Sequence, residues 1–139
     1  MHRLLADAHA DAHLEAMADI CRRPAWREFW EFLDVRTFSF GDFGLDQNIK
    51  DAKLWHFCQD EGLLLLTANR NDDGPDSLEA TIRADATVHS LPVLTIAKAH
   101  DFLKKRSYAE LAAIRLFEIL FDLEKYRGTG RLFLPEEFR

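Results

Sequence analysis

A run of four consecutive leucines at residues 63–66 constrains the fold of this chain more than any other feature. Such an uninterrupted apolar run suits a strand that is buried on both faces, as the central strands of parallel sheets are. Gly62 precedes the run as a helix-ending glycine, and a polar segment with Gly74 and Pro75 follows it as a loop. The run therefore predicts a central parallel strand that is entered from a helix and left through a loop.

Strands and helices are expected to alternate along the rest of the chain. β-favouring or apolar runs predict further strands that end at Asp7 and at residues 35–40, 92–97 and 131–134, the last at an edge. Helical periodicity and capping signals predict helices at about residues 8–20, 24–33, 46–61, 76–83 and 107–123. This alternation indicates the α/β class, as a single three-layer α/β/α domain over residues 1–139 with a mainly parallel central sheet of four to five strands.

Size and composition limit the class of protein. The 139 residues, 47% of them hydrophobic, suffice for one domain with a real core and are too few for two ordinary domains. No apolar run approaches the ~20 residues that span a bilayer, so we expect a soluble, cytoplasmic protein with no membrane partner. Cys21 and Cys58 lie far apart in apolar helical surroundings, which predicts buried thiols and not a disulfide scaffold. The net charge of −6 argues against a large DNA-coating surface.

Acidic side chains occur where predicted strands pass into helices or loops. Asp7 ends the first strand, Asp51 lies on a helix, and Asp72 and Asp73 follow the leucine-rich strand closely. The carboxyl ends of parallel strands meet at one edge of a sheet, where ligands of open α/β folds bind. Carboxylates delivered there by separate elements can hold a hard divalent cation, which takes oxygen ligands. This pattern favours metal-assisted phosphodiester chemistry.

These residues, in this order, resemble the PIN-like nuclease superfamily, in particular its small bacterial branch. The resemblance is carried by Leu4-Leu5-Ala6-Asp7, by Asp51-Ala52-Lys53-Leu54-Trp55 on a helix, and by the stretch from Gly62 to Arg70, and it covers about the first two thirds of the chain. It implies a metal-dependent endoribonuclease with Mg²⁺ or Mn²⁺ as cofactor and RNA as substrate. A role as a toxin, with an antitoxin-type protein partner, or in RNA turnover is implied as well.

Carried over position by position, the resemblance implies Asp7 and Asp51 as the first two catalytic and metal-binding acids. Related sequences carry an aspartate where this chain has Asn69, so the third acid is Asp72 or Asp73, and Asp72 is expected as the third metal ligand. Asn69, Arg70 and His9 are expected to contact substrate: Arg70 through bidentate guanidinium bonds to a phosphate, and His9 at the mouth of the site.

Each of the expected acidic residues also has an ordinary structural interpretation. Asp7 also fits an N-cap of the following helix, Asp51 a solvated helix charge, and Asp72 and Asp73 plain loop residues. His9 and His13 are four residues apart on a predicted helix, but no HExxH pattern accompanies them, so a solvated helix face or a phosphate contact is favoured over a zinc site.

Two kinds of surface are candidates for contact with a partner. Two groups of basic residues either guide an RNA backbone or are simply solvated. They are Arg22, Arg23 and Arg27, and separately Lys104, Lys105 and Arg106. Apolar residues of the last long helix are candidates for a homodimer surface as well as for the core: Leu116, Ile119, Leu120 and Leu123.

A second hypothesis keeps the PIN-like scaffold without the chemistry. Asn69 in place of an acid weakens the attraction for a divalent ion, and the chain is acidic overall. In this alternative the protein is a non-catalytic binding or protein-interaction module with a degenerate acidic site.

Overall fold

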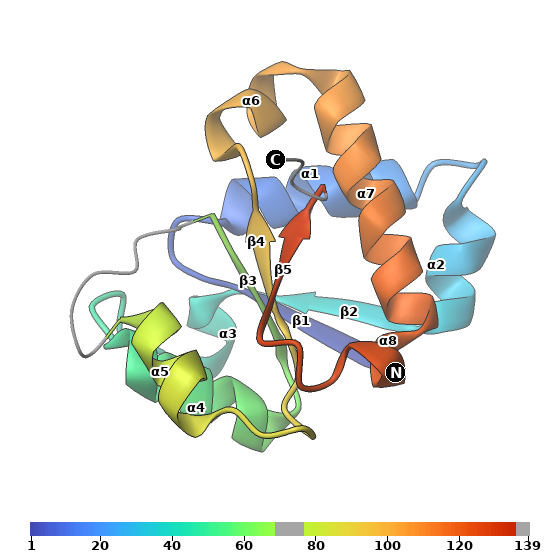
Figure 1. Cartoon of the computed structure of the whole chain (residues 1–139). Helices are drawn as coiled ribbons and strands as arrows, with labels where there is room; N and C mark the ends of the chain where they lie inside the picture. The colour runs from blue at the N-terminus through green and yellow to red at the C-terminus, as the bar shows by residue number, and fades with distance from the viewer. Residues whose placement is uncertain (69–76, 136–139) are drawn as a thin grey trace.

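A computed structural model describes residues 1–68 and 77–135 of the chain (Figure 1). Five strands form one sheet in the order β2-β1-β3-β4-β5, and all neighbouring strands are parallel. The strands are β1 (His2–Ala6), β2 (Val35–Phe38), β3 (Leu64–Thr67), β4 (Val93–Ile96) and β5 (Arg131–Leu134). The α/β class expected from the sequence is confirmed, with β3, the leucine-rich strand, at the centre.

Helices cover both faces of the sheet and make three layers (Figure 1). One face is covered by α1 (Asp11–Cys21), α2 (Arg27–Leu33), α6 (Ala99–Lys104), α7 (Arg106–Phe121) and α8 (Leu123–Tyr126). The other is covered by α3 (Phe40–Phe43), α4 (Asp51–Glu61) and α5 (Leu78–Asp85). None of the helices among the described residues is both long and apolar enough to cross a bilayer.

Alternate side chains of the central strands enter the two cores. Leu64 and Leu66 pack into the core under α1 and α7, whereas Leu65 packs into the core under α4 and α5. This is the period of two that a strand imposes. Each of the four leucines at 63–66 is at most 2% exposed, so an apolar residue is required at every position of the run and not only at alternate ones.

The last crossover differs in hand from the other three. The connections from β2 to β3 and from β3 to β4 move across the sheet in one direction, over the α4 and α5 face. The connection from β4 to β5 moves in the same direction, but through α6 and α7 on the α1 face. It therefore has the opposite hand, whereas parallel crossovers almost always share one hand. The result is that α6 and α7 pack beside α1.

Several boundaries differ from the sequence expectation. The segment after β2, where no helix was expected, forms α3, which Ser39 and Asp42 open as a reciprocal capping box. Helix α6 was not expected at all. Helix α4 begins at Asp51 and not after Asp46, whose carboxylate accepts a hydrogen bond from the Asn48 amide at 2.8 Å in a turn of its own. Helix α7 begins at Arg106, before the expected cap Ser107.

The apolar face of α7 is core. Leu116, Ile119 and Leu120 are buried against the sheet and α1, so these three are wrong as a homodimer surface. The large apolar side chains of α7 that are exposed are Leu111, Ile114 and Phe121. Phe121 lies next to the exposed Phe29 and Phe32 of α2.

Candidate active site at the carboxyl edge of the sheet

Asp7 lies between β1 and β3, directly after β1. Its backbone amide donates a hydrogen bond to the Leu66 carbonyl at 3.0 Å, which continues the β1–β3 pairing by one residue. The chain leaves β1 towards one side of the sheet and leaves β3 towards the other. Asp7 therefore stands at the switch point of the sheet, where open α/β folds bind their ligands.

Asp51 reaches the same edge from the next layer. It is the first residue of α4, and its Oδ2 accepts a hydrogen bond from the Leu78 amide at 3.2 Å. Leu78 begins α5, which follows β3 in the chain and runs back from the carboxyl edge. The sequence expectation that Asp51 is a plain solvated helix charge is therefore incomplete, because the carboxylate also ties α4 to α5.

Asp7 and Asp51 are both half-buried. Within residues 1–68 and 77–135, neither carboxylate forms a salt bridge with lysine or arginine. Each gives one oxygen to a backbone amide, that of His9 at 2.9 Å for Asp7 and that of Leu78 for Asp51, which leaves a second oxygen for a ligand.

Asp11 lies near both Asp7 and Asp42, and sequence reasoning missed Asp11 and Asp42 as candidate site residues. The pKa of Asp11 is raised above its ordinary value of 3.8 by partial burial first, and then by the negative charges of Asp7, Asp42 and Glu15. A raised carboxyl pKa among neighbouring carboxylates reports a locally negative potential. The sequence does hold a signal for Asp42, since Ser39-x-x-Asp42 has capping-box spacing. Asp11 had no local signal beyond its place in the first turn of a helix.

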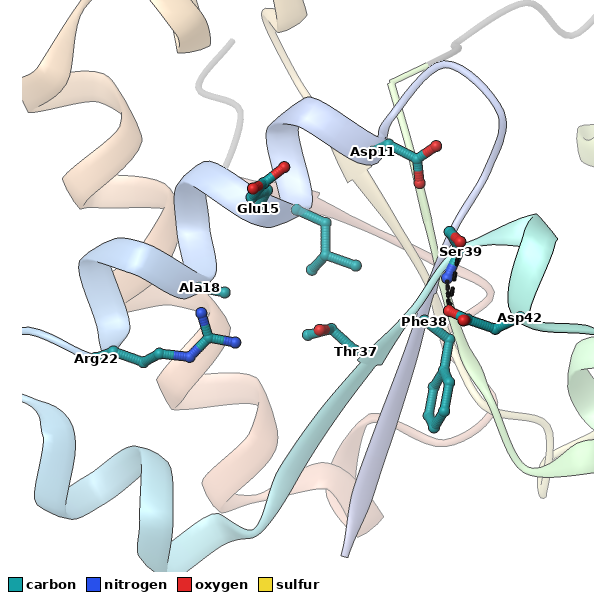
Figure 2. Close-up of a pocket in the computed structure, with 9 residues that line it drawn as sticks. Asp11, Glu15, Ala18, Arg22, Thr37, Phe38, Ser39 and Asp42 are labelled. Atoms are coloured by element: carbon teal, nitrogen blue, oxygen red, sulfur yellow. Dashed lines mark hydrogen bonds between the residues drawn. The ribbon is translucent and has the colours of Figure 1, made fainter.

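A cavity of about 420 Å³ opens next to these acids, between α1 and the edge strand β2. Helix α1 supplies Asp11, Glu15 and Arg22 along one wall, and Thr37, Ser39 and Asp42 face them from β2 and α3 (Figure 2). Because α1 runs away from the carboxyl edge, the acids lie at the end near Asp7 and Arg22 lies at the far end. Asp42 is partly committed, since its Oδ2 accepts hydrogen bonds from the Ser39 amide at 2.8 Å and the Ser39 hydroxyl at 3.3 Å.

His9 and His13 have different surroundings in the structure. His9 lies in the turn before α1 and is exposed at the carboxyl edge. His13 is 7% exposed, its Nε2 is hydrogen-bonded to the Ala99 carbonyl at 3.0 Å, and its ring packs against Phe102. A solvated or phosphate-contacting role for His13 is therefore wrong, and the pair does not share a helix face.

The remaining expected site residues are Asn69, Arg70, Asp72 and Asp73, all of which lie outside the described residues. Within the described part of the chain no group of three histidine, cysteine, aspartate or glutamate side chains could hold a metal ion. Asp7 and Asp51 supply hard oxygen donors of the kind that Mg²⁺ and Mn²⁺ take. Since Mg²⁺ is usually held by one or two carboxylates, with water and substrate phosphates completing its shell, these two acids fit such an ion.

Comparisons with protein-family models, with curated proteins and with solved structures find no match to this chain.

Proposed function

We propose that the protein is a metal-dependent endoribonuclease of the PIN-like type, which binds Mg²⁺ or Mn²⁺ at the carboxyl edge of its sheet. One observation carries the proposal: Asp7 and Asp51, which are 44 positions apart in the printed sequence, lie at the same edge of the sheet, and among the described residues neither forms a salt bridge with lysine or arginine. A carboxylate kept near the surface without such a partner is available to an ion from solution.

The chemistry follows from the donors. A bound divalent ion polarises a phosphoryl oxygen and lowers the pKa of water from about 15.7 towards neutrality. Asp7 and Asp51 would hold the ion through the carboxylate oxygens that are not hydrogen-bonded to backbone amides. Asp72 or Asp73 would complete the ligand set, Arg70 and Asn69 would contact the phosphate and the substrate, and His9 would contact RNA at the exposed rim.

Substitution of either acid tests the proposal. We expect Asp7→Asn and Asp51→Asn each to abolish Mn²⁺-stimulated cleavage of single-stranded RNA, measured with a fluorogenic oligonucleotide. The amide keeps an oxygen that can accept the His9 or Leu78 backbone bond, so the thermal melting curve should stay near that of the wild type.

Asp60→Asn is the matched control, because Asp60 is exposed at the opposite end of α4 and the charge change is the same. It should cleave like the wild type. Undiminished cleavage in both Asp7→Asn and Asp51→Asn would remove the assignment.

A second candidate function is a non-catalytic binding module on the same scaffold, in which Asp7 and Asp51 hold no ion. It is favoured by the lack of a three-residue metal-ligand group among the described residues. Calorimetric titration of Mn²⁺ into metal-free protein separates the two. Heat that disappears in Asp7→Asn supports the nuclease, and no heat at millimolar Mn²⁺ supports the binding module.

A further inference from the structure

A basic segment interrupts the acidic surface of this protein. Between Lys98 and Arg106 the chain carries four lysine or arginine residues and one acid, Asp101, although the net charge of the whole chain is −6. The side chains of Lys98, Lys104, Lys105 and Arg106 are exposed. Among the described residues, the three lysines form no salt bridge, and Arg106 reaches only Glu110 at 3.8 Å in an exposed pair. Exposed ion pairs of this kind interact weakly, so the segment from Lys98 to Arg106 remains electropositive.

The segment has a fixed place in the fold. Phe102, in the middle of α6, is 2% exposed and belongs to the larger core. The hydrogen bond between His13 Nε2 and the Ala99 carbonyl fastens the start of α6 to α1. Lys104 therefore lies on a helix that is anchored on its other side, and Lys98, Lys105 and Arg106 directly flank that helix.

This anchor places the start of α6 near the first turn of α1, which carries Asp11. Helix α6 follows the carboxyl end of β4, at the same edge as Asp7. His13 lies two residues after Asp11 on α1, about 3 Å along the helix axis. Because the last crossover passes over the α1 face, α6 lies on one side of Asp7, and Asp51 on α4 lies on the other. Figure 1 shows α6 above the end of β4, across the sheet from α4 and α5.

We propose that Lys98, Lys104, Lys105 and Arg106 form a track for the phosphates of single-stranded RNA, which leads the backbone to the acids at Asp7. This inference rests on the proposed function for its direction, and it adds where the substrate lies. Acidic groups alone repel a polyanion, so a nuclease with this edge needs cations nearby to bring a phosphate close. Lysine ammonium groups are point charges on flexible stems, which suits contact with a backbone irrespective of base sequence.

The test measures binding without cleavage. A fluorescently labelled oligouridylate is titrated with protein in EDTA, and anisotropy is followed from about 50 to about 200 mM salt. Each lost phosphate contact on a single strand lowers the slope of log affinity against log salt by about 0.7. We expect Lys104→Ala/Lys105→Ala to lower that slope by about 1.4 and to weaken binding roughly 10- to 100-fold at the lower salt.

Two further variants sharpen the result. Lys98→Ala, on the other side of α6, should lower the slope by about 0.7. The matched control is Arg36→Ala/Lys125→Ala, which removes the same charge from exposed positions on β2 and α8 and should leave the slope unchanged. All of these side chains are exposed, so the melting curves should match that of the wild type.

Equal losses in the control, or an unchanged slope in Lys104→Ala/Lys105→Ala, would overturn the track. So would lysine-dependent binding to phosphatidylglycerol vesicles without binding to the oligouridylate, which would assign the segment to an anionic lipid surface. The two proposals fail separately. Lysine-dependent RNA binding without any Mn²⁺-stimulated cleavage would keep the track and refute the nuclease, and cleavage with lysine-independent binding would do the reverse.

Discussion

At the scale of single residues, burial decides the chemistry of the two thiols. Cys21 in the larger core and Cys58 in the smaller are both free and buried, and burial raises the pKa of each from 9.0 to about 12. The positive charge of Arg22 opposes the shift at Cys21 without cancelling it. The expectation of buried thiols is confirmed, and neither thiol is suited to nucleophilic catalysis, because the thiolate is the reactive form.

These shifts predict how stability depends on alkaline pH. In the unfolded chain both thiols ionise near pH 9, whereas in the folded chain they keep their protons up to about pH 12. The folded state holds more protons in this window, so its stability falls as pH rises, by roughly 1.4 kcal/mol per thiol per pH unit. Urea unfolding at several pH values within the window should show a shallower decline for Cys21→Ala/Cys58→Ala than for the wild type. Parallel declines would contradict this.

At the scale of helices and strands, caps distinguish true helix starts from sequence look-alikes. The hydroxyl of Ser77 accepts a hydrogen bond from the Ala80 amide at 3.1 Å and caps α5. Ser107 lies one residue inside α7 and caps nothing. Ser77→Ala should therefore lower the free energy of unfolding by about 1 kcal/mol.

Ser107→Ala is the comparison, and it should change the free energy of unfolding by less than about 0.5 kcal/mol, because it lies on an exposed helical position where alanine is favourable. Chemical denaturation of both variants measures the difference. An equal loss of unfolding free energy in the two variants would mean that Ser107 does cap α7.

The same scale shows what the sequence could and could not predict. The strands were predictable because β3 and β4 are apolar except for one threonine each, and are bounded by turn residues or helix ends. Helix α6 was not, because its six residues are held by a buried Phe102 and by the His13–Ala99 bond, which are contacts distant in sequence. In α3, the capping box of Ser39 and Asp42 outweighed the β preference of Phe40.

At the scale of the whole molecule, the hand of the last crossover was beyond sequence reasoning. The usual rule would place α7 over α4 and α5, and no local pattern of α7 opposes it. The candidate site shows the same division. The places of Asp7 and Asp51 at element ends could be predicted, whereas Asp11 and Asp42 became neighbours of each other only through the packing of α1 against β2 and α3.

The two faces of the sheet should differ in stability. Among the described residues, 24 buried apolar residues make the core under α1 and α7, and nine make the core under α4 and α5. The thinner layer buries less apolar surface, so we expect it to open at a lower free energy. Native-state hydrogen exchange should show faster exchange for amides of α4 and α5 than for those of α1 and α7. Uniform protection would contradict the expectation.

The packing of α7 beside α1 also bears on how the chain folds. The larger core joins a helix from the first part of the sequence to one from the last. Such contacts join residues that are far apart in the sequence. A long loop must therefore close before the burial of these side chains can stabilise the fold. We therefore expect the folding rate of this domain to depend on an encounter between α1 and α7, the two most distant of its long helices.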